Sequence, residues 1–321
     1  MPGTSFLGQG FVFGVLGVLA TSIHMKGHTS NYNVSTGVGD ELGGESFGVV
    51  IGAQTDGAVL EDCVASFNGD LERSSVSAGI DFSVGQTATP SQGGKILNCV
   101  CNNNQAKVGA LGIGCFWVNV VIENCEASYN QTIGGISSPA NNASSIGAYG
   151  FDFVGTSLGE TTGGSSCHVV NCVASHNQAE NSDSAGFKTY EVAPFDPNAN
   201  PVFKAANKVT FENCKANNNI STNFTSYGFA LGNPTDDEAD RNSVECQLQN
   251  CIAKNNKIGF SQRDGFLNTF IGNTAEGNTP NYDTGIPQGL TSNVVTFTKA
   301  TGVFSGPGVV PPTAWSNLSI V

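Results

Sequence analysis

The sequence predicts an all-β fold in which short parallel strands stack into a solenoid. A phrase of the form Asn-Cys-x-Ala-x-x-Asn occurs seven times and fades to "GNTAEGN" in its last copy. A second phrase, a glycine followed by apolar, any and apolar residues, occurs eight times and alternates with the first. Repetition of this kind is typical of chains in which each repeat is one structural unit stacked on the next. The 39% hydrophobic and 12% charged residues, with 41 glycines, indicate a folded, turn-rich chain rather than a disordered one.

The glycine phrase predicts the main strands. Its copies are "GFVF" 10–13, "GVVI" 48–51, "GIDF" 79–82, "GIGC" 112–115, "GFDF" 150–153, "GFKT" 186–189, "GFAL" 228–231 and "GFSQ" 259–262. The first position after the glycine is always apolar: Phe11, Val49, Ile80, Ile113, Phe151, Phe187, Phe229 and Phe260. The next position is mixed: Val12, Val50, Asp81, Gly114, Asp152, Lys188, Ala230 and Ser261. One apolar and one mixed column predict half-buried strands with the apolar column inside.

The cysteine phrase predicts the bends and the narrow side of the interior. Its cysteines are Cys63, Cys99, Cys125, Cys172, Cys214 and Cys251, and each is followed two residues later by a small residue on the same face of a strand. Its closing asparagines are Asn68, Asn104, Asn130, Asn177, Asn219, Asn256 and Asn278. We expect each asparagine to cap a bend, where the left-handed region is tolerated, and to bond to its equivalent on the next rung. The repeated phrase is therefore interpreted as scaffolding.

The shortest complete period runs for 22 residues, from Cys251 to Asn273, and the others are lengthened by inserts. Two or three short strands and tight turns fit one rung of a parallel solenoid. About eight rungs at ~4.8 Å each would give a rod ~40 Å long.

The two phrases in register resemble the repeats of the right-handed parallel β-helix proteins with the pectin-lyase-like fold, over about residues 5 to 280. The resemblance implies an all-β, single-stranded right-handed parallel β-helix (solenoid) of about eight rungs with a non-repeat C-terminal tail. It implies no particular activity, because the fold hosts lyases, hydrolases, epimerases, tailspikes and surface proteins. The Asn-Thr-Asp, His-Gly and Arg-Ile-Lys motifs of its polygalacturonases are missing, and no arginine is placed as in its pectate lyases.

The charge balance argues against nucleic-acid binding. The net charge is −13, and the three arginines are scattered, whereas phosphate binding needs clustered basic residues. No run reaches the ~18–20 apolar residues of a transmembrane helix. The apolar start lacks a basic residue before its apolar run, so a signal peptide is the less favoured reading. We expect an extracellular or surface-associated protein.

The cysteines predict neither disulfides nor a metal site. Equivalent cysteines on parallel rungs point the same way, so a bridge between neighbours would be strained, and no Cys-x-x-Cys pair is present. Buried free cysteine behaves as a small hydrophobic residue. The four histidines are scattered, and none is assigned a role. No cofactor or metal is predicted.

Asp81 and Asp152 are the strongest enzymatic candidates. They share the outward column two rungs apart, with Gly114 between them. Two rungs place their backbones ~9.6 Å apart, near the upper limit of the carboxylate spacing in inverting glycosidases. The alternative, which we favour, is that they are ordinary outward charges and that Asp152 pairs with Lys188.

Long inserts at 83–95, 154–167, 190–208 and 232–245 leave the rod at the same corner. Loops on a rigid scaffold often bind ligands, so these inserts predict one binding wall, to which Tyr190, Phe195 and Phe203 would contribute. The equal alternative is that they merely cover the rod.

The domain organisation is a parallel β-helix over 1–280 and a tail over 281–321, interpreted as a cap or a subunit contact. Within the tail, "NVVTFTK" at 293–299 is predicted to be a strand. The end rungs of a solenoid expose strand edges, so we expect partners to be other copies docking end to end. Three functions follow: a non-catalytic structural or surface protein, which we favour; a glycoside hydrolase or lyase acting on polysaccharides; and a glycan-binding adhesin or tailspike-like module.

Overall fold

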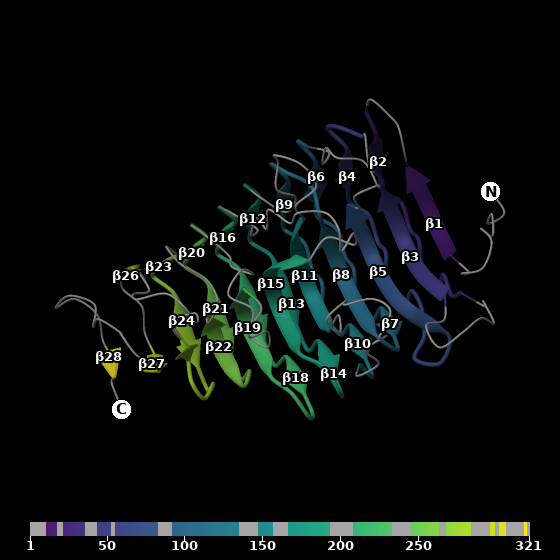
Figure 1. Cartoon of the computed structure of the whole chain (residues 1–321). Coiled ribbons are helices and arrows are strands. Elements are labelled where there is room, and N and C mark those ends of the chain that lie inside the picture. The colour runs from purple at the N-terminus through teal and green to yellow at the C-terminus, as the bar shows by residue number, and fades with distance from the viewer. Residues whose placement is uncertain are drawn as a thin grey trace, which may run out of the picture.

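The structure is a computed structural model, and it describes residues 11–17, 22–35, 44–52, 55–82, 92–134, 147–156, 166–192, 208–232, 245–262, 268–283, 296–298, 302–305 and 318–319. None of these segments forms a helix, and so none of them supplies an apolar helix long enough to cross a membrane. All the strand pairs within them are parallel, which is the arrangement that the repeats predict. The strands succeed one another along the rod in chain order, from purple to yellow in Figure 1.

The glycine phrases form the largest sheet. Its strands, in order, are β1 (Phe11–Gly17), β3 (Gly44–Ile51), β5 (Ser74–Phe82), β8 (Gly109–Cys115), β11 (Ala148–Thr156), β15 (Ser184–Val192), β19 (Ser226–Leu231), β22 (Ile258–Ser261), β25 (Tyr282–Asp283), β27 (Gly302–Ser305) and β28 (Leu318–Ser319). The first eight come from the eight glycine phrases, as predicted. The other three come from the tail.

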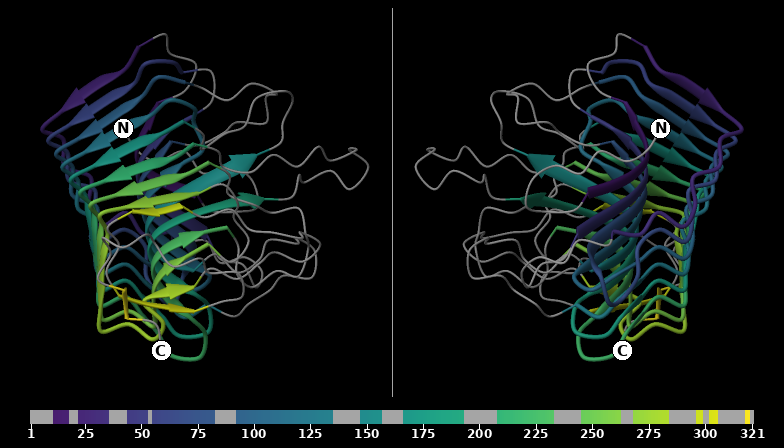
Figure 2. Two further views of the ribbon diagram at one scale, coloured as in Figure 1. Left: turned by 90° about the vertical axis from the view of Figure 1, so that its left-hand side faces the viewer. Right: turned by 90° about the vertical axis from the view of Figure 1, so that its right-hand side faces the viewer.

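The cysteine phrases and the residues on either side of them form three further sheets, which wind with the large sheet around one axis (Figure 2). The second largest sheet contains β2 (His24–Lys26), β4 (Val59–Glu61), β6 (Lys95–Leu97), β9 (Val121–Glu123), β12 (His168–Val170), β16 (Thr210–Glu212), β20 (Gln247–Gln249), β23 (Thr269–Ile271) and β26 (Thr296–Thr298). One short sheet contains β7 (Gln105–Ala106), β10 (Gln131–Thr132), β14 (Gln178–Ala179) and β18 (Ile220–Ser221). The other contains β13 (Val173–Ser175), β17 (Lys215–Asn217), β21 (Ile252–Lys254) and β24 (Thr274–Glu276).

The interior is one continuous apolar core. The predicted inward column from Val49 to Phe260 is at most 1% exposed, and the aromatic rings in it stack from rung to rung. Phe187 and Phe229 have ring centroids 4.7 Å apart, and Phe229 and Phe260 have centroids 5.0 Å apart. These distances match the ~4.8 Å rung spacing, because equivalent side chains of successive rungs lie directly above one another.

The predicted asparagine ladder is present. Each buried asparagine donates its Nδ2 to the Oδ1 of the next, at 2.8 to 3.2 Å. The ladder also extends beyond the predicted residues, to Asn33 at one end and to Asn281 at the other. Asn33 closes the phrase "GHTSNYN" at 27–33, a copy that sequence reasoning missed because glycine and histidine replace its asparagine and cysteine.

Left-handed backbone was predicted for both asparagines of the phrase, the one before the cysteine and the closing one. Only the first has it. The residue before each cysteine of the phrase, an asparagine in all copies but that of Asp62, has a φ between 52 and 55°, as predicted. The ladder asparagines are not in this region. The residue before each of them is, as at Tyr129 and His176, because the ladder side chain must point into the rod to bond along the axis.

The repeated glycines are explained by a close approach of the two phrases. A Cβ on Gly112 would lie 2.5 Å from the Cβ of Ala127 and 2.7 Å from the carbonyl oxygen of Gly150. In the same way, a Cβ on Gly150 would lie 2.6 Å from the Cβ of Ala174. Glycine is needed here because any side chain would collide with the alanine of the cysteine phrase.

The outer face of the large sheet differs from the half-buried face that the sequence predicts. Its side chains form a second apolar cluster that includes Phe47, Leu111, Tyr149 and Tyr227. The mixed outward column is also buried: Asp81 is 7%, Asp152 1% and Lys188 5% exposed. Parallel sheets are commonly covered on both faces, and a column of mixed residue types does not reveal that cover.

The strands of the tail continue the same sheets. β25 pairs with β22, β26 with β23, and β27 with β25, so the parallel stacking extends beyond the predicted boundary at residue 280. β26 lies within the predicted strand at 293–299. That the tail caps the rod or contacts a subunit stays a prediction.

Candidate functional site

The register brings the two candidate carboxylates into one column. Asp81 on β5 lies opposite Gly114 on β8, and Gly114 lies opposite Asp152 on β11. A Cβ on Gly114 would lie 2.8 Å from Oδ1 of Asp81, so the carboxylate of Asp81 leans over the glycine. The space above Gly114 is therefore occupied by the side chain of Asp81 itself, and it is not open to a sugar.

Asp152 has a basic neighbour on the next rung. Lys188 on β15 lies opposite Asp152 in the register of the sheet. The Nζ of Lys188 donates a hydrogen bond of 2.6 Å to Oη of Tyr149 and lies 4.4 Å from the centroid of that ring. Lysine therefore meets both a hydroxyl and an aromatic face, a contact that favours the cationic form.

Burial and charge oppose each other at Lys188. Burial lowers its pKa, and the nearby carboxylates of Asp183 and Asp152 act in the opposite direction. Burial raises the pKa of Asp183, partly offset by Lys188 and by a backbone hydrogen bond of 3.1 Å from Thr225. Burial together with the charges of Asp183 and Asp152 raises the pKa of Tyr149 well above its usual range. Tyr149 is therefore protonated and is a hydrogen-bond donor or acceptor, not a base.

The outer-face cluster is defined by these five residues: Asp81, Tyr149, Asp152, Asp183 and Lys188. Sequence reasoning found Asp81, Asp152 and the partner Lys188 but missed Tyr149 and Asp183. Tyr149 stands one residue before a repeated glycine, in the column of Leu111 and Tyr227. Aromatic residues in that column were a signal that side chains gather outside the large sheet.

The chemistry open to the cluster is proton transfer or the binding of a polar group. A hydrolytic pair needs one carboxyl to act as acid and another as base or nucleophile on opposite sides of the bond. Here one carboxylate faces a lysine and both are nearly covered. In the described part of the chain, no group of three His, Cys, Asp or Glu side chains is arranged to hold a metal ion.

The thiols are unsuited to nucleophilic chemistry. All ten cysteines are free and buried. The backbone N–H groups of Cys99 and Cys125 each donate to the sulfur of the next ladder cysteine at 3.4 Å. Burial raises the pKa of Cys246 to about 12, so this thiol stays protonated.

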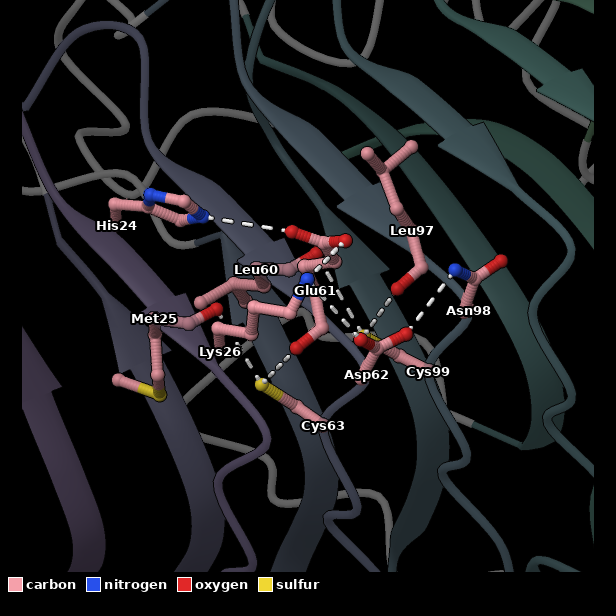
Figure 3. A network of polar contacts seen from close by, with 10 residues as sticks. All are labelled: His24, Met25, Lys26, Leu60, Glu61, Asp62, Cys63, Leu97, Asn98 and Cys99. Atoms are coloured by element: carbon pink, nitrogen blue, oxygen red, sulfur yellow. Dashed lines mark hydrogen bonds and ion pairs between the residues drawn. The ribbon is translucent and has the colours of Figure 1, made fainter.

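A second polar network, on the outside of the β2–β4–β6 region, is shown in Figure 3. Lys26 pairs with Glu61 at 2.7 Å, and His24 approaches the same carboxylate at 3.6 Å. Asn98 donates to Asp62 at 3.1 Å. These side chains are largely in solvent, where ion pairs contribute ~0–1 kcal/mol, so the network is a solvated surface of the repeat.

The predicted binding wall stays a prediction. Tyr190 belongs to β15, but its side chain lies outside the described part of the structure, as do Phe195 and Phe203. The inserts from which the wall would be built are likewise outside it over most of their length.

Comparison with known proteins gives two similar solved structures. No family model matches the chain, and no curated protein does. Among solved structures it is similar to the crystal structure of pectate lyase Pel9A, with 16% identity and a TM-score of 0.45, covering 84% of this chain and 57% of that one. It is also similar to the Dettilon tailspike protein (gp208), with 12% identity and a TM-score of 0.39, covering 95% of this chain and 58% of that one. The chain spans less than three fifths of the length of either.

Both of those structures are parallel β-helix proteins. The parallel sheets that wind around one axis establish the class by themselves: the chain has the right-handed parallel β-helix fold. The likenesses assign no activity to this chain.

Proposed function

We propose that this chain is a non-catalytic structural or surface protein, a rigid β-solenoid that associates with further copies end to end. The proposal rests on the direction of the asparagine ladder. Between the side chains of the buried ladder, each Nδ2 donates to the Oδ1 of the next asparagine toward the C-terminal end. The rod is thus polar, and a copy docked head to tail would continue the same donor-to-acceptor sequence.

The end strands support the same geometry. In the described part of the chain, β1 pairs with β3 and β2 pairs with β4, both in parallel. A second copy approaching from the N-terminal side would meet these strands with its own parallel strands. Docking of unlike ends is a heterologous contact, which builds filaments when the rotation between copies does not close. An extracellular or surface location accompanies this proposal.

Electron microscopy and sedimentation velocity at rising protein concentration test it. We expect end-to-end oligomers, and we expect Asn33→Lys to reduce them because it places a charge at the start of the ladder. Gln178→Lys is the control, since Gln178 is exposed in the middle of the rod. Monomers alone at high concentration, with the tail intact, would reject the proposal.

A polysaccharide-active enzyme is the second candidate, because the outer-face cluster gathers three carboxyls, a lysine and a tyrosine on one side of the rod. A panel of polysaccharides assayed for reducing ends, and for the ultraviolet absorbance of unsaturated products, tests it. Activity that Asp81→Asn, Asp152→Asn or Lys188→Met abolishes would establish the enzyme. No activity toward any polymer would leave the non-catalytic function.

A further inference from the structure

The residue immediately before each ladder asparagine forms a surface column, here called the pre-asparagine column. Its members are Tyr32, Phe67, Asn103, Tyr129, His176, Asn218, Asn255 and Gly277. All eight have a left-handed backbone, with φ between 53 and 69°. The column lies at the corner of the rod from which β7, β10, β14 and β18 start (Figure 1).

The N-terminal part of this column contains bulky rings where the fold does not need them. A left-handed backbone is costly for tyrosine, phenylalanine and histidine, and cheap for asparagine and glycine. The same position is asparagine in three copies and glycine in one, and those rungs stack equally well. Backbone strain that the scaffold can avoid points to a role for the side chains.

The rings are stacked in two exposed pairs. Tyr32 and Phe67 have centroids 5.2 Å apart at an interplanar angle of 13°, and Tyr129 and His176 have centroids 4.8 Å apart at 8°. Stacking does not remove them from water, since Tyr32 is 72%, Phe67 43% and Tyr129 50% exposed. The core stacks of the same rod, by contrast, are fully buried.

Asn103 separates the two pairs. Phe67 and Tyr129 belong to rungs on either side of it, so their rings are ~9.6 Å apart along the rod. One further ring placed midway between them would lie ~4.8 Å from each, the same spacing that the stacked rings of the rod have. Asn218 and Asn255 further along the column bond to each other at 3.2 Å, whereas the side chain of Asn103 bonds to no described residue. Its amide is thus available between two aromatic faces.

The surroundings favour a neutral ligand with hydroxyl groups. Gln105, Gln131 and Gln178 lie in one row, each two residues after a member of the column, and Nε2 of Gln105 donates to Oε1 of Gln131 at 3.5 Å. The chain has a net charge of −13. On the rung of Tyr129, the carboxylate of Glu126 accepts a hydrogen bond of 3.0 Å from the amide of Asn102. A polyanion would be repelled. A pyranose ring offers C–H faces to aromatic rings and hydroxyls to amides.

We propose that Phe67, Asn103 and Tyr129, extended by Tyr32 and His176, form a binding site for a ring of a neutral saccharide. The C–H faces of the sugar lie against Phe67 and Tyr129, and its hydroxyls bond to the Asn103 amide. This site lies on a different surface from the outer-face cluster, and it requires neither catalysis nor end-to-end assembly.

Isothermal titration calorimetry of the full chain with cellohexaose, xylohexaose and mannohexaose tests the site, with polygalacturonate as the anionic control. We expect one of the neutral oligosaccharides to bind and polygalacturonate not to bind. Phe67→Asn, Tyr129→Asn and Asn103→Gly should each weaken binding at least tenfold. Phe224→Asn, at an exposed aromatic residue outside the column, should leave it unchanged.

Thermal unfolding separates binding from structure. Because asparagine fits the left-handed backbone better than a ring, Phe67→Asn and Tyr129→Asn should unfold at the same temperature as the wild type or higher. The proposal is overturned if no neutral oligosaccharide binds, or if the ring variants bind as tightly as the wild type. It is also overturned if the rings pair rods side by side, seen as a dimer in sedimentation that Phe67→Asn removes.

Discussion

The buried asparagine ladder makes one substitution in the middle of the rod far more damaging than another on the same rung. Asn177 is 0% exposed and takes part in four side-chain hydrogen bonds. Its Oδ1 accepts from the backbone N and the Nδ2 of Asn130, at 3.1 and 2.9 Å. Its Nδ2 donates to Oδ1 of Asn219 at 3.0 Å and to the carbonyl oxygen of Ala127 at 3.3 Å.

Asn177→Ala removes all four bonds and leaves buried donors on Asn130 without an acceptor. A net ~1 kcal/mol for each of the four bonds gives an expected loss of at least ~4 kcal/mol in the free energy of unfolding, because the stranded donors add to it. Water cannot replace the side chain easily, because the position is fully covered.

Asn171→Gly is the matched control, six residues earlier on the same rung. Asn171 is exposed and left-handed with φ 54°, and its Nδ2 donates one bond of 3.2 Å to Asn124. Glycine keeps that backbone conformation, so we expect a loss of at most ~1 kcal/mol. Urea unfolding followed by far-ultraviolet circular dichroism measures both. Equal losses in the two variants would refute the view that the buried ladder, and not the exposed one, stabilises the rungs.

Three other predictions concern the core, the close approach of the phrases, and pH. Phe229→Ala removes a ring that stacks between Phe187 and Phe260 and should cost ~3–5 kcal/mol in thermal or urea unfolding, whereas Phe229→Leu should cost clearly less. Gly150→Ala should abolish soluble expression, because its Cβ would lie 2.6 Å from that of Ala174, whereas Gly93→Asn, at φ 76° with open space around it, should express normally. Burial raises the pKa of Glu45 to about 7 from 4.5, so the folded chain holds this proton where the unfolded chain has lost it. The free energy of unfolding should therefore fall as the pH rises between those two values and level off above them, and Glu45→Gln should remove this part of the pH dependence; a wild-type and variant difference that is constant with pH would contradict it.

The sequence alone predicted most of the scaffold. The columns of Phe187, Cys172 and Asn177 recur in register, and in a solenoid equal positions of successive repeats must lie above one another. The inward column, the asparagine ladder and the parallel strands followed from that rule. The repeat "GHTSNYN" at 27–33 escaped notice because only its last asparagine and its bend are shared with the other copies.

The candidate site was predictable only in part. The column containing Asp81, Gly114, Asp152 and Lys188 could be read from the repeat, because register fixes which residues are neighbours. That Asp81 leans over Gly114 and that Lys188 bonds to Tyr149 depends on side-chain rotation and on the residues outside the sheet, which no repeat position determines.

The order of residues along the chain thus determined the winding of the backbone, since identical phrases can all be satisfied at once only by stacking. Tertiary structure decided which faces of that winding are exposed to solvent. It covered the carboxylates that the pattern places outside, and it left the rings of Phe67 and Tyr129 in water beside a buried ladder. The physical reason is that burial depends on what packs against a face from elsewhere in the chain, and periodicity contains no information about that.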